Sequence, residues 1–148
     1  LHGARPGVPA PWPRSDFEET ERQTLGRDLA GMLGLTYALG ERDLGLRPIR
    51  ARRAQVIEPA GEETTGEVGR LVVEVPDAAL PRAVIFRDSF TVGLAPFLSE
   101  HFSRAVFLWQ NTFDADVVIR EHADVVVQEI VGRHLYGYVP TPELVPSP

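Results

Sequence analysis

The chain has 148 residues, which suits one domain with a sizeable core and is too short for two substantial domains. Hydrophobic residues make up 43%, charged residues 24%, and the mean hydropathy is -0.10, so the composition excludes both a disordered chain and a membrane-embedded one. The 15 basic and 21 acidic residues give a net charge of -6, which argues against nucleic acid or an anionic membrane as partner.

The absence of cysteine excludes disulfides, thiolate zinc sites and cysteine nucleophiles. Asp114, Asp116 and Asp124 lack the glycine and terminal glutamate of a calcium loop, so we expect capping carboxylates there. The sequence therefore predicts no metal and no cofactor.

The amino-terminal third is predicted to be a linker followed by a helix. Residues 1–15 contain four prolines and are expected to be extended, and the start at Leu1 without a signal-peptide pattern favours a processed or truncated product. Ser15 and Glu18 fit a capping box, and apolar residues from Phe17 to Leu33 recur at roughly helical spacing. We expect a helix over 16–33 and a loop over 36–47.

Two β-rich stretches follow, at 49–58 and 67–75, separated by a polar run. Partial alternation of apolar residues in the second stretch predicts a hairpin with one solvated face. We interpret this hairpin, at about 48–76, as an insertion in the domain.

From residue 82 onward, short apolar runs alternate with helical patterns. The runs are 83–86, 105–109 and 125–130, and the helical stretches between them are 91–102 and 115–122. This order predicts an α/β fold, a parallel βαβαβ sheet flanked by helices. Residues 136–148, with four prolines, are expected to be a surface tail.

The junction most able to carry chemistry is the end of the first run, where a buried-looking strand stops at Asp88 and Ser89 and a helix begins. Ligands of open α/β sheets bind at this edge, and free N–H groups of a helix start can hold an oxyanion beside a serine hydroxyl. Both residue types are also common helix caps. The local pattern therefore leaves capping and catalysis open.

A serine nucleophile needs a base, usually histidine. His101 lies about 18 Å along the following helix, and His122 precedes the third strand at the opposite sheet edge. His134 emerges on the correct edge but lacks a neighbouring Asp-x-x-His or Asp-x-His pattern, and His2 lies in the proline-rich segment. His134 is the histidine of this chain that geometry admits as a base.

Five stretches follow one another in a defined order and spacing: 26–33, 86–90, 96–102, 107–110 and 123–129, with Arg133 and Leu135. Together they resemble the SGNH-hydrolase-like domain of alginate O-acetylation proteins. The resemblance covers about 16–135, and it is carried by the order and spacing of these stretches. It implies a partial SGNH-like domain, with 1–15 as linker and 136–148 as tail.

The resemblance implies a Ser–His–Asp acyl-transfer site in which Ser89 matches the nucleophile. In that family the Asp and His belong to an Asp-x-His-Trp type motif before the serine segment, and this chain contains no such motif. We therefore expect an incomplete domain, inactive by itself. Asp88 and Phe90 are expected to position the turn or hold the oxyanion, together with Arg87, which stands where many relatives carry glycine.

Four polar residues near the same edge are candidates for substrate binding. Gln110 and Asn111 follow the second strand, although loop amides often satisfy their own backbone. Glu129 ends the third strand, and Arg133 lies four residues later, so the two can alternatively pair on a helical turn.

The resulting hypothesis is a serine-dependent acyltransferase that O-acetylates a cell-envelope polysaccharide, with an acyl donor and a polysaccharide as partners. The envelope or periplasmic location and the acetyl specificity come from the resemblance. Two alternatives stay open: a non-catalytic carbohydrate-binding or scaffolding module, and a serine esterase that uses His134.

Overall fold

The structure is a computed structural model, and it describes residues 7–58 and 69–137. The chain forms two compact units, Ala10–Arg52 and the remainder. The boundary at Arg52 falls within the stretch 16–135 that we interpreted as one partial domain. Each unit is described separately below.

The smaller unit is a hairpin with one short helix. After η1 (Arg14–Asp16), β1 (Phe17–Leu25) pairs antiparallel with β2 (Gly40–Pro48), and α1 (Asp28–Met32) lies between them in the chain. The predicted helix over 16–33 and the loop over 36–47 are therefore wrong. The stretch 18–24 contains no apolar residue that a helix could bury, whereas its charges pair across the strands, as Arg22 does with Asp43.

The larger unit is built on one mixed sheet in the order β3-β4-β6-β5-β7. Its strands are β3 (Gln55–Glu58), β4 (Leu71–Glu74), β5 (Arg82–Arg87), β6 (Arg104–Trp109) and β7 (Val125–Gln128). β5 pairs parallel with both β6 and β7, so the predicted βαβαβ arrangement is confirmed.

The predicted hairpin forms, and it belongs to the main sheet. β3 pairs antiparallel with β4, and β4 continues the sheet by pairing antiparallel with β6; the connection 59–68 lies outside the described residues. Val72 and Val73 are both buried although they face opposite ways, so both faces of β4 are covered. The expected solvated face is therefore wrong for β4.

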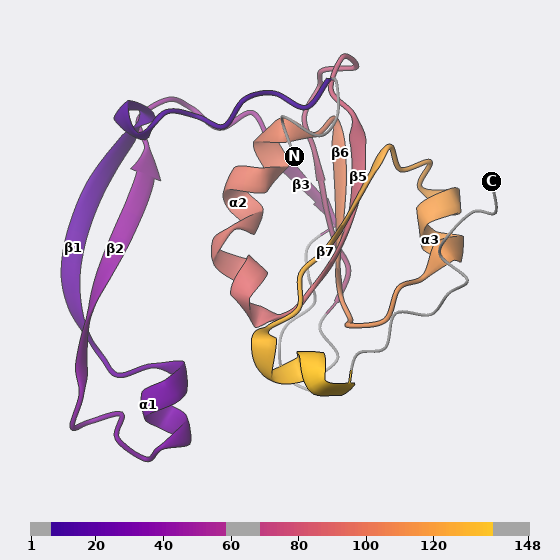
Figure 1. The fold of residues 1–148 in the computed structure, drawn as a ribbon. Helices are drawn as coiled ribbons and strands as arrows, with labels where there is room; N and C mark the ends of the chain where they lie inside the picture. Colours follow the sequence, from indigo (N-terminus) through magenta and orange to yellow (C-terminus); the bar gives the residue numbers. More distant parts are fainter. Residues whose placement is uncertain (1–6, 59–68, 138–148) are drawn as a thin grey trace. The chain divides into compact units, whose positions relative to one another are not determined.

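Helical segments cover the two faces of the sheet. The link from β5 to β6 contains η2 (Ser89–Gly93), α2 (Ala95–Leu98) and η3 (Ser99–His101), where we expected one helix over 91–102. The link from β6 to β7 contains α3 (Ala115–Arg120), and η4 (Gly132–Gly137) follows β7. Figure 1 shows α2 and α3 on opposite faces of the sheet.

Each face of the sheet has its own hydrophobic core, because alternate residues of the central strands point opposite ways. The α2 side buries Val8, Val73, Ala83, Ile85, Ala95, Phe102, Ala105, Phe107 and Val125, and the α3 side buries Val72, Val84, Phe86, Val106 and Val117. Burial on both faces explains why the strands of this region are continuous apolar runs.

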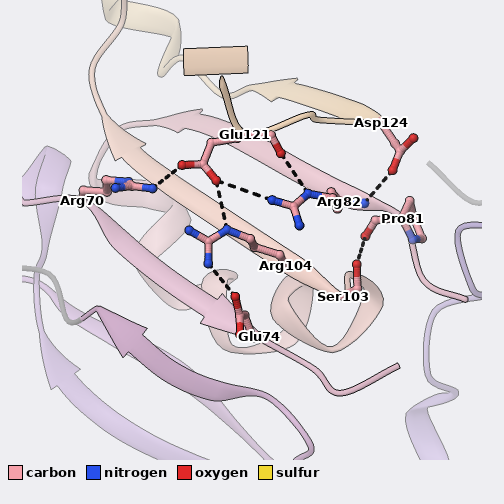
Figure 2. A network of polar contacts seen from close by, with 8 residues as sticks. All are labelled: Arg70, Glu74, Pro81, Arg82, Ser103, Arg104, Glu121 and Asp124. Atoms are coloured by element: carbon pink, nitrogen blue, oxygen red, sulfur yellow. Dashed lines mark hydrogen bonds and ion pairs between the residues drawn. The ribbon is translucent and has the colours of Figure 1, made fainter. Parts of the chain in front are cut away.

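The amino-terminal ends of β5 and β6 are closed by a polar network around Glu121 (Figure 2). The Glu121 carboxylate accepts hydrogen bonds from Arg70 and from Arg104 Nε, the latter at 2.9 Å, and Arg82 donates to the Glu121 carbonyl at 2.8 Å. Arg104 also donates to Glu74 at 2.5 Å. Burial raises the pKa of Glu121, but Arg104, Arg70 and Arg82 outweigh it and lower that pKa below its ordinary value.

We predict that Glu121→Gln destabilises the larger unit, called the sheet unit below. Removing one partner of a buried ion pair leaves charges uncompensated, and because the arginines are partly exposed we expect a loss of about 2 kcal/mol in the free energy of unfolding. Urea denaturation followed by circular dichroism measures it. Glu21→Gln is the control, because Glu21 and Arg42 are exposed and 4.0 Å apart, and a change above about 0.5 kcal/mol there would contradict the argument.

Candidate functional site

The site lies at the carboxyl end of β5, the strand between β6 and β7. The link that leaves β5 passes over the α2 face, and the link that leads to β7 passes over the α3 face. When connections leave neighbouring parallel strands toward opposite faces, the carboxyl edge between those strands is where open α/β sheets bind ligands. Ser89 begins η2 at this point, and it is exposed.

Asp88 fixes the turn that carries Ser89. It is 5% exposed, and its carboxylate caps η2 by accepting the N–H of Phe90 at 2.9 Å through Oδ1. Oδ2 accepts the N–H of Val131 at 2.7 Å, which links the turn to the segment after β7. The carboxylate of Asp88 therefore caps η2 and also positions the turn, which are the two roles that the sequence left open for this residue.

The environment of Asp88 favours its ionised form. Burial raises the pKa of this carboxyl, whereas the hydrogen bonds from the Phe90 and Val131 amides lower it. The interaction with Glu129 and the charge of His134 act in the same direction, so the pKa lies below its ordinary value. The turn therefore holds a carboxylate at neutral pH.

The amides of the turn are not equivalent as oxyanion donors. The Phe90 N–H is already donated to Asp88, so in this structure Phe90 does not offer its amide to a substrate. Ser89 is the first residue of η2, and the first N–H groups of a helix lack an intrahelical acceptor. Within the described residues, the amide of Ser89 forms no hydrogen bond.

Arg87, at the position where many relatives in the resemblance carry glycine, contacts both the Trp109 ring and the backbone of the turn. The residue is 5% exposed, its guanidinium lies 4.5 Å from the centre of the Trp109 ring, and Nη1 donates to the Asp88 carbonyl at 3.2 Å. This stacking desolvates the cation against an aromatic face. Arg87 thus stabilises the turn through its hydrogen bond to the Asp88 carbonyl.

The four candidates for substrate binding are placed differently. Gln110 donates to the Thr112 carbonyl at 3.0 Å, which satisfies its own loop, and the Asn111 side chain lies 3.4 Å from Nδ1 of His134. Glu129 contacts the Ser89 turn: its Oε2 accepts the N–H of Asp88 at 3.0 Å. It precedes η4, so the helical-turn pairing with Arg133 is not supported by the backbone, and the Arg133 side chain lies outside the described ones.

Three residues of this site were missed by sequence reasoning. The Thr91 hydroxyl, 1% exposed, donates to Glu129 at 3.0 Å, and Gln128 donates to the Asn111 carbonyl at 2.7 Å. Val131 contributes only a backbone amide. Nothing in the order of residues connects Thr91 to a glutamate that follows it by 38 positions.

The histidines lie where the strand order places them. His122 precedes β7, at the opposite edge from Ser89, and His134 lies in η4 beside Asn111 at the same edge as Ser89. No hydrogen bond joins Ser89 to a histidine in the described part of the chain, and His2 lies outside it.

The described residues contain no group of histidine and acidic side chains that would hold a metal ion. Among the same residues, no helix has the length and apolarity needed to cross a membrane.

The sequence matches no protein-family model and no curated protein sequence. Solved structures are similar in fold: a DHHW family protein from Eubacterium siraeum (TM-score 0.60, 11% identity, 82% of this chain and 49% of that one) and Bacillus cereus PatB1 with a sulfonyl adduct (TM-score 0.57, 17% identity, 79% and 47%). A second PatB1 structure matches with a TM-score of 0.51, 14% identity and coverage of 79% and 49%.

The fold is α/β and SGNH-like. The predicted fold class is therefore confirmed. The chain spans about half the length of the solved structures it resembles. At these identities the likeness concerns the fold. The more specific resemblance to alginate O-acetylation proteins stays a prediction.

We predict that Asp88→Asn destabilises the sheet unit, because an asparagine has one acceptor oxygen and leaves the amide of Phe90 or Val131 without an acceptor. The expected loss is about 1–3 kcal/mol in the free energy of unfolding at neutral pH, measured by urea denaturation.

The same variant tests the pH dependence. A carboxyl whose pKa is lower in the folded state contributes stability above its unfolded pKa of about 4, and this contribution is lost as pH falls through the folded value. We expect stability to fall less steeply with acid in Asp88→Asn than in the wild type. Parallel stability curves between pH 5 and about pH 2 would contradict this assignment.

Proposed function

We propose that the intact protein containing this chain is a serine-dependent acyltransferase that O-acetylates a cell-envelope polysaccharide, with Ser89 as nucleophile. The observation that carries the proposal is the placement of Ser89. An exposed serine lies at the carboxyl end of the central parallel strand, on a turn fixed by a buried carboxylate. This is the position from which α/β sheets present reactive groups.

The chemistry that this placement supports is acyl transfer in two steps. Ser89 Oγ attacks the acyl carbonyl while a base takes its proton, and the leaving group of the donor departs with a proton. The hydroxyl of the acceptor then attacks the acyl-serine, forms the new ester and returns the proton to Ser89. In each step the Ser89 N–H is available to the developing oxyanion.

The likeness to PatB1 supports the nucleophile. A sulfonyl adduct forms when a nucleophilic group attacks a sulfonyl electrophile, and such an adduct is recorded for PatB1. The acetyl group, the polysaccharide and the envelope location rest on the resemblance to alginate O-acetylation proteins. A His–Asp pair that this chain lacks would activate Ser89, as that resemblance implies.

We predict that Ser89→Ala abolishes turnover of a chromogenic acetyl ester by the full-length protein. Loss of a covalent nucleophile costs about 10³-fold or more in kcat, while the fold persists because Ser89 is exposed. Release of the chromophore measures activity, and circular dichroism checks folding. Turnover equal to that of the wild type would exclude this nucleophile, and absence of turnover in the wild type would favour a scaffolding module.

A separate prediction tests the esterase alternative. Nδ1 of His134 faces the Asn111 side chain, and its ring is exposed, so we expect His134→Gln to change kcat by less than about twofold. The same ester assay measures it. A loss comparable to that in Ser89→Ala would instead identify His134 as the base and support the esterase.

A further inference from the structure

One carboxylate oxygen of Glu129 binds a residue before Ser89 and a residue after it. Glu129 Oε2 accepts the N–H of Asp88 and the hydroxyl of Thr91, each at 3.0 Å. Ser89 and Phe90 are the two residues between these anchors. Their backbone is therefore tied at the residue before and at the residue after.

The segment that carries Glu129 is itself anchored. The Glu129 N–H donates to the carbonyl of Phe86, near the carboxyl end of β5, at 2.9 Å. Two residues later, the Val131 N–H donates to Asp88 at 2.7 Å. Three hydrogen bonds thus connect the residues after β7 to the turn after β5, and a fourth connects them to β5 itself. The two residues between the anchors, Ser89 and Phe90, are both exposed.

The residues that hold the turn are buried, whereas the candidate nucleophile is exposed. Asp88 and Thr91 are almost fully buried, at 5% and 1% exposed, so losing the hydrogen bonds they make to Glu129 would leave buried polar groups without partners. Ser89 is exposed. The carboxylate therefore acts on the orientation of Ser89 through its neighbours.

We infer that Glu129 is a positioning residue that, through Asp88 and Thr91, fixes the orientation of the Ser89 hydroxyl and amide for attack on an acyl or sulfonyl electrophile. This inference rests on the proposed function and adds a residue to it. A misplaced nucleophile reduces the rate of the chemical step more than the affinity for the reagent.

The test measures covalent labelling of Ser89 by an aryl sulfonyl fluoride in the full-length protein, followed by intact mass and peptide mapping. Labelling rates measured at several reagent concentrations give two separate quantities: the maximal labelling rate at saturation and the reagent concentration at half-saturation. Thr91→Val removes the hydroxyl at nearly constant shape, and we expect the saturating rate to fall about tenfold with half-saturation unchanged. Thr91→Ser, which keeps the hydroxyl, is expected to label within about twofold of the wild type.

A double-mutant cycle tests whether Thr91 acts through Glu129. Glu129→Gln keeps the shape of the side chain and removes its charge, and we expect a similar loss of the saturating rate. Because both changes weaken the same carboxylate, Thr91→Val should have little further effect in the Glu129→Gln background. Effects that multiply independently would overturn the shared role.

Matched controls make the same substitutions elsewhere. Thr24→Val alters a half-buried threonine of β1, and Glu74→Gln alters a glutamate that pairs with Arg104 at the amino-terminal end of β6. Both should label within about twofold of the wild type. A tenfold loss in either would show that labelling reports general destabilisation and would overturn the inference.

The remaining outcomes distinguish this inference from the proposed function. If the folded wild type labels at Ser89 and both Thr91→Val and Glu129→Gln label equally fast, the positioning role is wrong and the nucleophile stands. If the wild type labels no more than Ser89→Ala, the nucleophile is wrong and the positioning role falls with it. If Glu129→Gln does not fold, Thr91→Val and Thr91→Ser decide the question.

Discussion

The sheet unit depends on the burial of β5 between two parallel neighbours, with polar groups gathered at both of its ends. Its residues from Ala83 to Phe86 are at most 2% exposed, so every backbone group there must be satisfied by β6 and β7. Carboxylates lie beyond both ends of this pairing: Glu121 binds arginine side chains at the amino end, and Asp88 with Glu129 accept backbone amides at the carboxyl end. The two ends use carboxylates for different purposes.

At the amino end the carboxylate is surrounded by cations. Three arginines converge on Glu121 and leave its charge compensated from several sides, as Figure 2 shows. At the carboxyl end the carboxylates accept mainly backbone N–H groups and one hydroxyl. Such bonds hold a turn without covering it with long side chains, which leaves Ser89 exposed.

Another buried carboxylate, that of Glu100, holds the segment that leads into the edge strand β3. Glu100, 2% exposed, accepts the backbone N–H groups of Arg53 and Ala54 at 3.1 Å, just before β3. A buried charge is tolerated only where donors replace water, and here the donors come from a segment 46 or more residues away. Acidic residues thus tie together segments that the sequence separates widely, although the chain as a whole carries excess negative charge.

The sequence by itself determined the parallel core and the position of Ser89, because apolar runs of strand length separated by helical patterns have few other solutions. It did not determine the hairpin of β1 and β2, since charged strands are stabilised by cross-strand partners, here 15 to 31 residues away, rather than by local periodicity. Nor did it reveal the contacts of Glu129. Which backbone amide and which hydroxyl share one carboxylate depends on how the ends of β5 and β7 meet, and only the tertiary structure decides that.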